Sequence, residues 1–287
     1  MRRRYLQCLR CNAEDEGWLG SARMLVLSWP RRWLCRLASA HLRITRHVAR
    51  RVRLPRSTVI HYGVPEAEAG ESAPLRQEPP ANPSTLTVGY VGRLVQEKDV
   101  PTLIEAVRQV RVRGDEITLT IIGDGPERKR LEDLATRAGF ETSAVFTGAL
   151  RGPQLHNAAQ NVDVLVLQSR WEEPAGLVVM EQMMRGRPVV VTDNGGAAEL
   201  VGDAGLSFPP RDTAALAQCM RRFTDEPELL ATLGERARNK ALDLFSQQCM
   251  VENHYNLFQV LLEAHQAKQA AVLPVTNKSA CLSKAPY

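Results

Sequence analysis

Between residues 86 and 208, short continuous apolar segments alternate with segments of helical periodicity, and no other feature constrains the fold as strongly. Strands that are apolar at every position belong to parallel sheets that are covered on both faces. The sequence therefore predicts an α/β fold, a Rossmann-like parallel sheet with helices on both faces. The expected strands are 86–91, 117–122, 144–146, 162–167, 187–191 and 205–208, and the expected helices are 102–112, 127–138, 153–159, 177–184 and 197–201.

The other segments divide the chain into four parts. Residues 64–85 are rich in Pro, Glu, Ala and Ser, which is typical of a linker or a long surface loop. We expect an N-terminal part over 1–63, the main domain over 86–264 and a flexible tail over 265–287. Further expected elements are strands at 41–45 and 58–61, a basic helix at 46–53, and helices at 212–224, 227–243 and 246–264.

Positive charge is concentrated near the N-terminus. Residues 1–60 contain fourteen Arg and three acids, in a chain with a net charge of +5. Such a segment can bind phosphates, anionic lipid or nucleic acid, or it can be a solvated basic face. No RNA-binding aromatic motif or zinc-finger spacing accompanies it, so nucleic acid is not expected as a partner. The amphipathic stretch 22–40 fits a membrane surface or, as we prefer, a core-facing helix.

The six Cys are scattered along the chain, which favours reduced thiols in a cytoplasmic protein. Cys8 and Cys11 form a lone CxxC pair, a weak signal for a metal or redox site. No run of about 18 apolar residues is present, and the acids at 14–16 interrupt the stretch that would follow a signal-peptide start. We expect a cytoplasmic protein, with peripheral contact at the inner membrane face as an open alternative.

Ligands of open parallel sheets bind outside the carboxyl ends of the strands, so the turns at those ends are the candidate sites. The first such turn is Gly92-Arg93-Leu94, and Lys98 follows five residues after Arg93. A planar Arg fork and a Lys point charge together suit a diphosphate. Two ordinary surface cations would give the same pattern, and both interpretations stay open at this turn.

The second turn is Gly123-Asp124-Gly125-Pro126. Its glycines permit a close approach of the backbone to a ligand, and they equally permit a plain tight turn before a helix. The turn is neither a Walker loop, because no Gly-Lys-Ser/Thr follows, nor a full G-x-G-x-x-G.

The third turn lies between Ser169 and the expected helix at 177–184, and it contains Glu173. Pro174 and Gly176 place Glu173 ahead of the helix, whose first N–H groups form an anion site. Glu181 lies one turn into that helix and can reach the same crevice. A carboxylate at each edge of a helix N-terminus is suited to hold sugar hydroxyls beside a phosphate.

In this order the motifs resemble those of the retaining GT-B glycosyltransferases of the group 1 type, glycosyltransferase family 4. The resemblance covers about residues 86–263 and, more loosely, 41–63. It implies that 86–264 is a nucleotide-sugar-binding domain and that 1–63 is an incomplete second Rossmann-like domain on the acceptor side. The matching motifs are Gly-Arg-Leu with Glu97-Lys98, Gly-Asp-Gly-Pro, the Glu-x7-Glu pair, Gly186-Arg-Pro-Val-Val and Asp193-Asn-Gly-Gly with Glu199.

The resemblance implies a nucleotide-diphosphate sugar as donor and assigns the nucleotide half of its site. Glu181 would bind the ribose hydroxyls, and Arg93 and Lys98 would neutralise the diphosphate. Gly92 would let the backbone approach the phosphates, and the backbone from Thr147 to Leu150 would meet the base.

For the sugar half of the site, the resemblance implies that Glu173 holds the donor sugar and the distal phosphate, with the amides of Gly176 and Leu177. Gly123 would also line the donor. The implied catalytic residues are Glu173, Arg93 and Lys98.

The implied reaction retains the anomeric configuration. The acceptor attacks from the face that the leaving group departs, and the leaving phosphate takes the acceptor proton, so no protein nucleophile is needed. No Asp-x-Asp motif is present, in line with the family's independence of metal, and we expect no cofactor. Cationic side chains and a helix N-terminus would stabilise the leaving diphosphate.

Three features depart from the family pattern. Ala175 stands where Phe is usual, which should loosen the packing of the Glu173 turn. Asp99 follows Lys98 where Gly is common. About 63 residues precede the linker, and they resemble only the closing part of the family's N-terminal domain.

Two functions follow from this comparison. The first is transfer of a hexosyl group from a UDP- or GDP-sugar to a sugar, lipid or polysaccharide acceptor. The alternative is a catalytically incomplete nucleotide-sugar-binding fragment that lacks the acceptor domain.

Overall fold

A computed structural model describes residues 40–52, 56–65, 85–140 and 143–272. The expected amphipathic stretch at 22–40, apart from residue 40, and the Cys8–Cys11 pair lie outside these residues, as does most of the expected linker.

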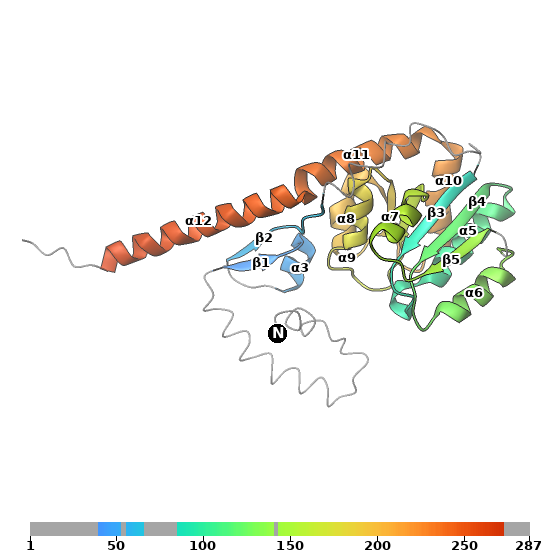
Figure 1. The fold of residues 1–287 in the computed structure, drawn as a ribbon, viewed down its shortest axis with the longest axis horizontal. Coiled ribbons are helices and arrows are strands. Elements are labelled where there is room, and N and C mark those ends of the chain that lie inside the picture. The colour runs from blue at the N-terminus through green and yellow to red at the C-terminus, as the bar shows by residue number, and fades with distance from the viewer. Residues whose placement is uncertain (1–39, 53–55, 66–84, 141–142, 273–287) are drawn as a thin grey trace, which may run out of the picture.

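The main domain is built on a six-stranded parallel sheet, as the sequence predicts (Figure 1). Its strands lie in the order β5-β4-β3-β6-β7-β8. Because the order reverses between β3 and β6, the carboxyl ends of these two strands form the switch point at which ligands of such sheets bind. The strands are β3 Thr85–Val91, β4 Glu116–Ile122, β5 Ala144–Gly148, β6 Val164–Leu167, β7 Val189–Thr192 and β8 Leu206–Phe208.

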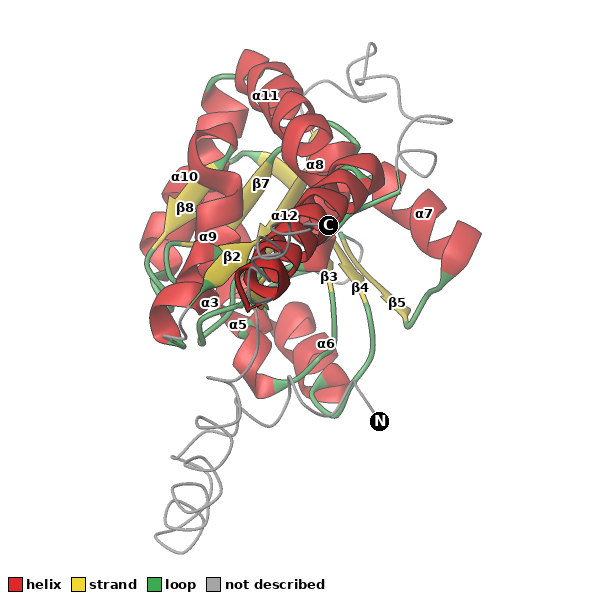
Figure 2. Ribbon diagram, turned by 90° about the vertical axis from the view of Figure 1, so that its left-hand side faces the viewer, coloured by secondary structure: helices red, strands yellow, loops and turns green. Residues whose placement is uncertain are grey.

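Helices cover both faces of this sheet, as Figure 2 shows from the side. One face is covered by α5 and α10, and the other by α8, α9 and part of α11. The helices are α5 Val100–Val112, α6 Arg128–Arg137, α7 Gly152–Gln160, α8 Leu177–Met184, α9 Gly195–Val201, α10 Thr213–Asp225 and α11 Glu228–Phe245, with 3-10 turns at η1 Gln96–Lys98 and η2 Gly202–Ala204.

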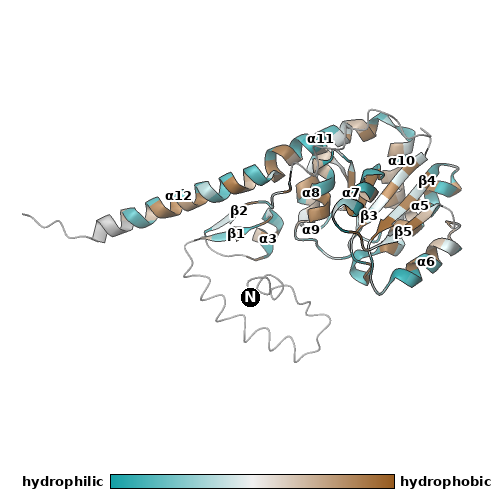
Figure 3. Ribbon diagram, in the orientation of Figure 1, coloured by the Kyte–Doolittle hydropathy of each residue, from teal (hydrophilic) through white to brown (hydrophobic). Residues whose placement is uncertain are grey.

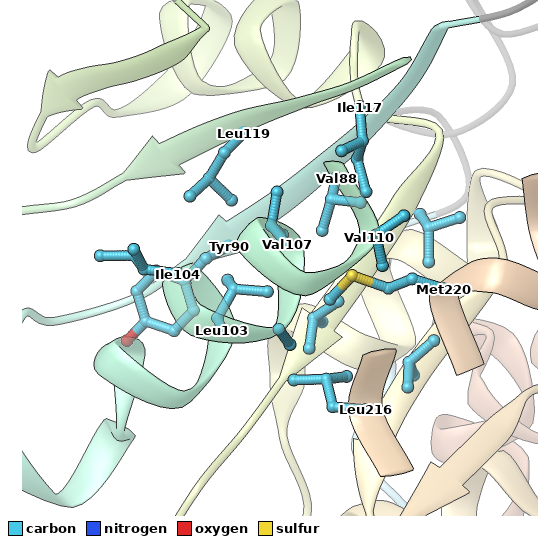
Figure 4. Close-up of a cluster of buried hydrophobic side chains, with 14 of the residues drawn as sticks. Val88, Tyr90, Leu103, Ile104, Val107, Val110, Ile117, Leu119, Leu216 and Met220 are labelled. Carbon is cyan, nitrogen blue, oxygen red and sulfur yellow. The ribbon is translucent and has the colours of Figure 1, made fainter. Parts of the chain in front are cut away.

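Strand β6 shows why the central strands are apolar at every position. Val164 and Val166 point into the core beneath α5 and α10, whereas Leu165 and Leu167 point into the core beneath α8 and α9. Successive side chains of a strand alternate between faces, and both faces are buried here. Figure 4 shows the core beneath α5 and α10, where Val107 of α5 and Met220 of α10 lie among side chains of β3 and β4. Figure 3 shows the apolar character of the strands of the sheet.

A small N-terminal unit packs beside α9. It consists of β1 His41–Arg43, α3 Arg46–Arg51 and β2 Ser57–Val59, and its two strands pair in parallel. Val64, expected at the start of the linker, is instead buried in the core with α8 and α9. A single apolar residue beside a proline gives no periodic signal, so the sequence does not indicate this contact.

The last helix, α12, spans Gln247–Val272 and runs beyond residue 264, where we expected it to end. Part of the segment 265–287 is therefore helical and was wrongly expected to be a tail. Beyond its first turns α12 extends away from the sheet domain (Figure 1) and leaves Val251, Tyr255 and Phe258 each more than half exposed. In the described part of the chain, no helix has the length and apolar character needed to cross a bilayer.

Candidate functional site

Three turns meet at the switch point of the sheet. The turn 92–99 follows β3, the turn 123–127 follows β4, and the segment 168–176 leads from β6 to α8. These segments carry the three turn motifs that the sequence analysis places at the ends of strands. The structure therefore brings the candidate residues of the first and third turns to the same edge of the sheet.

The closest contact between the first and third turns is an ion pair. The Lys98 Nζ lies 2.5 Å from Glu173 Oε1, and Lys98 and Glu173 side chains are only 19% and 9% exposed. The Ser169 hydroxyl donates to the same carboxylate oxygen at 2.5 Å. Charge-assisted hydrogen bonds of this kind are stronger and more directional than neutral ones. The Glu173 carboxylate is thereby fixed facing Lys98.

Arg93 occupies the rim of the site. Its guanidinium is exposed and forms no ion pair within the described residues, so it is available to an anion. The backbone beneath it is fixed, because the Tyr90 hydroxyl donates to the Arg93 carbonyl at 2.8 Å. Burial, helped by the charge of Glu173, raises the pKa of Tyr90 well above its ordinary value. The phenol therefore stays protonated and keeps donating.

The first and second turns touch through their backbones. Gly123 has a φ of 148°, and a Cβ at this position would lie 1.8 Å from the Gly92 carbonyl oxygen. Leu94 N–H donates to the Asp124 carbonyl at 2.9 Å. Only glycine fits at position 123, and the two turns form one continuous layer.

The Glu173 turn is held from the other side by α9. Gly196 N–H donates to the Glu173 carbonyl at 2.5 Å, and a Cβ on Gly195 would lie 2.7 Å from Glu173 N and O. Gly195 also has a φ of 88°, which favours glycine. Ala175, which replaces a usual Phe, is buried at 4% exposure in the core below. The paired glycines of the Asp193-Asn-Gly-Gly motif thus serve to seat this turn.

Helix α8 begins where the sequence predicts, at Leu177, after Gly176 with a φ of 90°. The first N–H groups of a helix have no acceptor inside it, and its N-terminal end is positive. Glu181 lies one turn into α8 and is partly exposed. The candidate site therefore has Arg93 and Lys98 on the β3 side, and on the β6 side it has Glu173 followed by the positive N-terminal end of α8.

The candidate base-binding segment, from Thr147 to Leu150, lies beside the second turn. Gly123 N–H donates to the Gly148 carbonyl at 2.9 Å, so the end of β5 lies against the second turn. Thr147 lies inside β5 and its hydroxyl donates to Gly148 O at 3.0 Å, while Leu150 is partly buried in the connection to α7. No group of His, Cys, Asp and Glu side chains suited to a metal ion occurs among the described residues.

Sequence reasoning gave no role to the contacts that join the N-terminal unit to the site. Thr45 is fully buried, caps α3 by accepting from Val48 N, and donates to the Pro174 carbonyl at 2.7 Å. Glu199 accepts from the N–H groups of Arg46 and His47 at 2.8 and 2.7 Å. Glu199 was visible as part of a motif, but Thr45 carried no local signal for its long-range contact.

A second charged contact on the same two turns was also missed. The Arg170 guanidinium binds the buried carboxylate of Asp99, with Nη2 2.7 Å from Oδ1. An Asp in place of a common Gly was the only signal in the sequence.

Comparison with known proteins gives one family. The family model for glycosyl transferases group 1 matches residues 72–240. An alpha-D-kanosaminyltransferase from Streptomyces kanamyceticus is 35% identical over 150 residues, which are 52% of this chain and 39% of that protein. The chain thus spans about two fifths of the length of this relative.

Solved structures show the same fold. The sucrose-phosphate synthase of Thermosynechococcus elongatus superposes with a TM-score of 0.70 at 25% identity, over 82% of this chain and 61% of that one. Anabaena HepE in complex with UDP and glucose gives a TM-score of 0.66 at 26% identity, over 78% and 64% of the two chains. Both are GT-B structures, the fold class that the resemblance implied.

Proposed function

The chain belongs to the group 1 family of glycosyl transferases, and on that basis we propose that it transfers a hexosyl group from a UDP- or GDP-sugar to a sugar, lipid or polysaccharide acceptor. We further propose that the anomeric configuration is retained. Residues 86–264 would be the donor-binding domain, and the unit that precedes it would lie on the acceptor side.

The observation that carries this proposal is the meeting of Arg93, Lys98 and Glu173 at the switch point. Two cations on the turn after β3 suit a diphosphate, and the fixed carboxylate after β6 suits sugar hydroxyls. A nucleoside diphosphate sugar is the ligand that presents both groups side by side. HepE, which matches this chain over most of its length, was solved with UDP and glucose and supports the same class of donor.

The remaining donor contacts are assigned by position. Glu181 would accept from the ribose hydroxyls, and the backbone from Thr147 to Leu150 would meet the base. The amides of Gly176 and Leu177 would bind the distal phosphate at the start of α8, where helix N-termini favour anions. Gly92 and Gly123, which have no side chains, would let the backbone approach the phosphates closely.

In the proposed reaction, the bond between the anomeric carbon and the distal phosphate breaks while a bond to the acceptor oxygen forms on the same face. The acceptor proton passes to an oxygen of the leaving phosphate. Arg93 and Lys98 stabilise the charge that develops on the diphosphate, and the Glu173 carboxylate orients the sugar. No protein nucleophile takes part.

Turnover of a donor panel tests the proposal. The purified chain should release UDP or GDP from one of a set of UDP- and GDP-hexoses when mixed oligosaccharide and lipid acceptors are present. NMR of the product should show the same anomeric configuration as the donor. Inverted product would overturn retention, and nucleotide that is never released from any donor would count against transfer by this chain.

A second candidate is a nucleotide-sugar-binding module that does not catalyse transfer by itself. It is favoured by the exposed apolar side chains of α12, such as Tyr255 and Phe258, because exposed apolar surface often marks a protein interface. This candidate predicts tight UDP or GDP binding without transfer. Adding back candidate partner proteins and restoring turnover would distinguish it from an inert protein.

Contact with a membrane surface is a further part of the proposal. Arg46 and Arg50 of α3 are exposed, and basic side chains near a surface attract anionic lipid. The chain should then float with vesicles that contain anionic lipid and remain at the bottom with neutral ones. Equal behaviour on both vesicles would dispose of this contact.

A further inference from the structure

Asp99 and Arg170 form a second brace between the two turns that carry Lys98 and Glu173. The Asp99 side chain is 2% exposed, and its Oδ1 accepts from both Nε and Nη2 of Arg170, at 2.8 and 2.7 Å. The Arg170 backbone N–H also donates to the Glu97 carbonyl at 2.9 Å. Asp99 is the neighbour of Lys98, and Arg170 is three residues from Glu173, so the two charged pairs run side by side.

The backbone at Asp99 is in a conformation that few residues adopt. Its φ of 51° and ψ of 39° lie in the left-handed region, which glycine adopts easily and which most other L-residues adopt rarely. The side chain is not used to cap α5, because no backbone N–H of the helix donates to it. Its second oxygen accepts from the Thr102 hydroxyl at 2.8 Å. The carboxylate is therefore turned toward Arg170.

A bound donor would change the two pairs differently. This step rests on the proposed function: the donor diphosphate would compete with Glu173 for Lys98, and sugar hydroxyls would compete with Lys98 for Glu173. The Asp99 carboxylate is more deeply buried than that of Glu173. In the proposed binding mode, the donor would not compete for either member of the Asp99–Arg170 pair. It would remain as the connection between the turns when the Lys98–Glu173 pair opens.

We propose that Asp99 and Arg170 are positioning residues that hold the Lys98 turn against the Glu173 turn, both before and after a donor enters. They act through Lys98 and Glu173 and do not touch the donor. Asp99 stands at a backbone position that favours glycine, and its carboxylate secures Arg170 and with it the spacing of the donor site.

The direct test is the chemical reactivity of Lys98, measured in the full chain without any ligand. An amine-reactive reagent, followed by peptide mass spectrometry, gives the modification rate of Lys98 relative to that of exposed Lys129. Asp99→Gly fits the left-handed backbone and removes the carboxylate, so it should fold and raise the relative rate roughly threefold or more, as expected when a charged contact is lost. Arg170→Gln should have the same effect.

Two variants separate positioning from general loosening. Asp99→Asn keeps a side-chain oxygen and tolerates the left-handed region, so it should restore much of the wild-type rate. Arg108→Ala breaks the exposed pair with Glu105 on the same α5 helix and should leave Lys98 unchanged. In the double variant Asp99→Gly with Arg170→Gln, the relative modification rate of Lys98 should be no higher than in either single variant, because both substitutions remove the same interaction.

An unchanged Lys98 rate in folded Asp99→Gly and Arg170→Gln would overturn the proposal. UDP and GDP are tested separately as protectants of Lys98 in the wild-type chain. Absence of protection by both would contradict the proposed function, while the ligand-free comparison would still decide the role of the pair. If the chain turns over a donor, Asp99→Gly should raise the donor KM more than it lowers kcat. The reason is that the spacing of the two turns is lost in the free protein, before the donor binds.

Discussion

The ammonium of Lys98 lies 2.5 Å from the carboxylate of Glu173, although 75 residues separate them in the chain. The contact joins the turn after β3 to the turn after β6, on the two sides of the switch point. In the absence of donor, each of these side chains partly neutralises the other. Under the proposed function, a donor that offers phosphate to Lys98 and hydroxyls to Glu173 would replace this pair with two new contacts.

Lys98→Ala should weaken the binding of UDP or GDP by roughly 10- to 100-fold, the value of one charge-assisted hydrogen bond. The same substitution leaves the Glu173 carboxylate without its cation. Lys129→Ala removes an exposed lysine of α6 and provides the matched control, with affinity close to wild type. Calorimetric titration measures both. Equal affinity of the two variants would show that Lys98 does not contact the nucleotide.

Glu181 and Arg93 should differ in what they recognise. Arg93→Ala should weaken the binding of UDP or GDP and of pyrophosphate alike, by roughly tenfold, because a diphosphate contact is shared by both ligands. Glu181→Gln should weaken nucleotide binding and leave pyrophosphate binding unchanged, because pyrophosphate has no ribose. Competition titrations with both ligands give the comparison. A loss of pyrophosphate affinity in Glu181→Gln would contradict the ribose assignment.

Gly123→Ala should destabilise the fold by roughly 3 kcal/mol or more, because strain at a φ of 148° adds to a clash with Gly92 O at 1.8 Å. Gly114→Ala is the control, since Gly114 also has a left-handed φ of 105° but no heavy atom within 4 Å of the new Cβ. Gly114→Ala should lose only about 1–2 kcal/mol. Urea unfolding of both variants separates strain from contact. Similar losses of unfolding free energy in the two variants would mean that the turns 92–99 and 123–127 can move apart without a large cost.

Thr45→Val keeps the shape of a fully buried side chain and removes both its bond to Pro174 O and its cap of α3. We expect a loss of about 1–3 kcal/mol in unfolding free energy. Hydrogen exchange should become faster in 41–51 and in the Glu173 turn. Thr136→Val, on the exposed surface of α6, should change neither measurement. Faster exchange in the N-terminal unit alone would show that the turn does not depend on it.

The docking of α3 should weaken as the pH falls from about 7 to about 5. Burial, followed by the charge of Arg51, lowers the pKa of His47, while Glu199 acts in the opposite direction and Arg50 adds to the lowering. A group whose folded pKa is depressed stabilises the fold above its ordinary pKa of about 6.5 and loses that contribution as acid protonates it. Neutral His47 can donate from Nε2 to Glu172, 3.0 Å away.

His47→Gln should therefore flatten the dependence of the thermal midpoint on pH in this interval. Wild type and variant with parallel profiles between about pH 7 and about pH 5 would exclude His47 as the responsible group.

Much of the fold could be predicted from the sequence because burial of both sheet faces leaves a direct pattern. Continuous apolar runs such as 162–167 and the start of α8 at Leu177 were predicted closely. Element ends were less certain, because helix termini depend on packing. Helix α12 continues to Val272, none of its side chains described between 247 and 267 is buried, and no sequence signal marked its end.

The candidate site was predictable as far as its residues sit at strand ends. Arg93, Lys98 and Glu173 were selected because each follows a predicted strand, and parallel strands bring their carboxyl ends to one edge, where the structure places all three. The contacts that hold the site were not predictable. Thr45 reaches Pro174 across 129 residues and Arg170 reaches Asp99 across 71, and neither separation has a periodicity that a sequence pattern reveals.

The central claim is that the switch point between β3 and β6 binds a nucleoside diphosphate, and calorimetric titration of the full chain with UDP and with GDP tests it most directly. The account predicts saturable one-to-one binding of at least one of the two, weakened roughly 10- to 100-fold in Lys98→Ala. Absence of binding by both nucleotides, or binding that Lys98→Ala and Arg93→Ala leave unchanged, would contradict it.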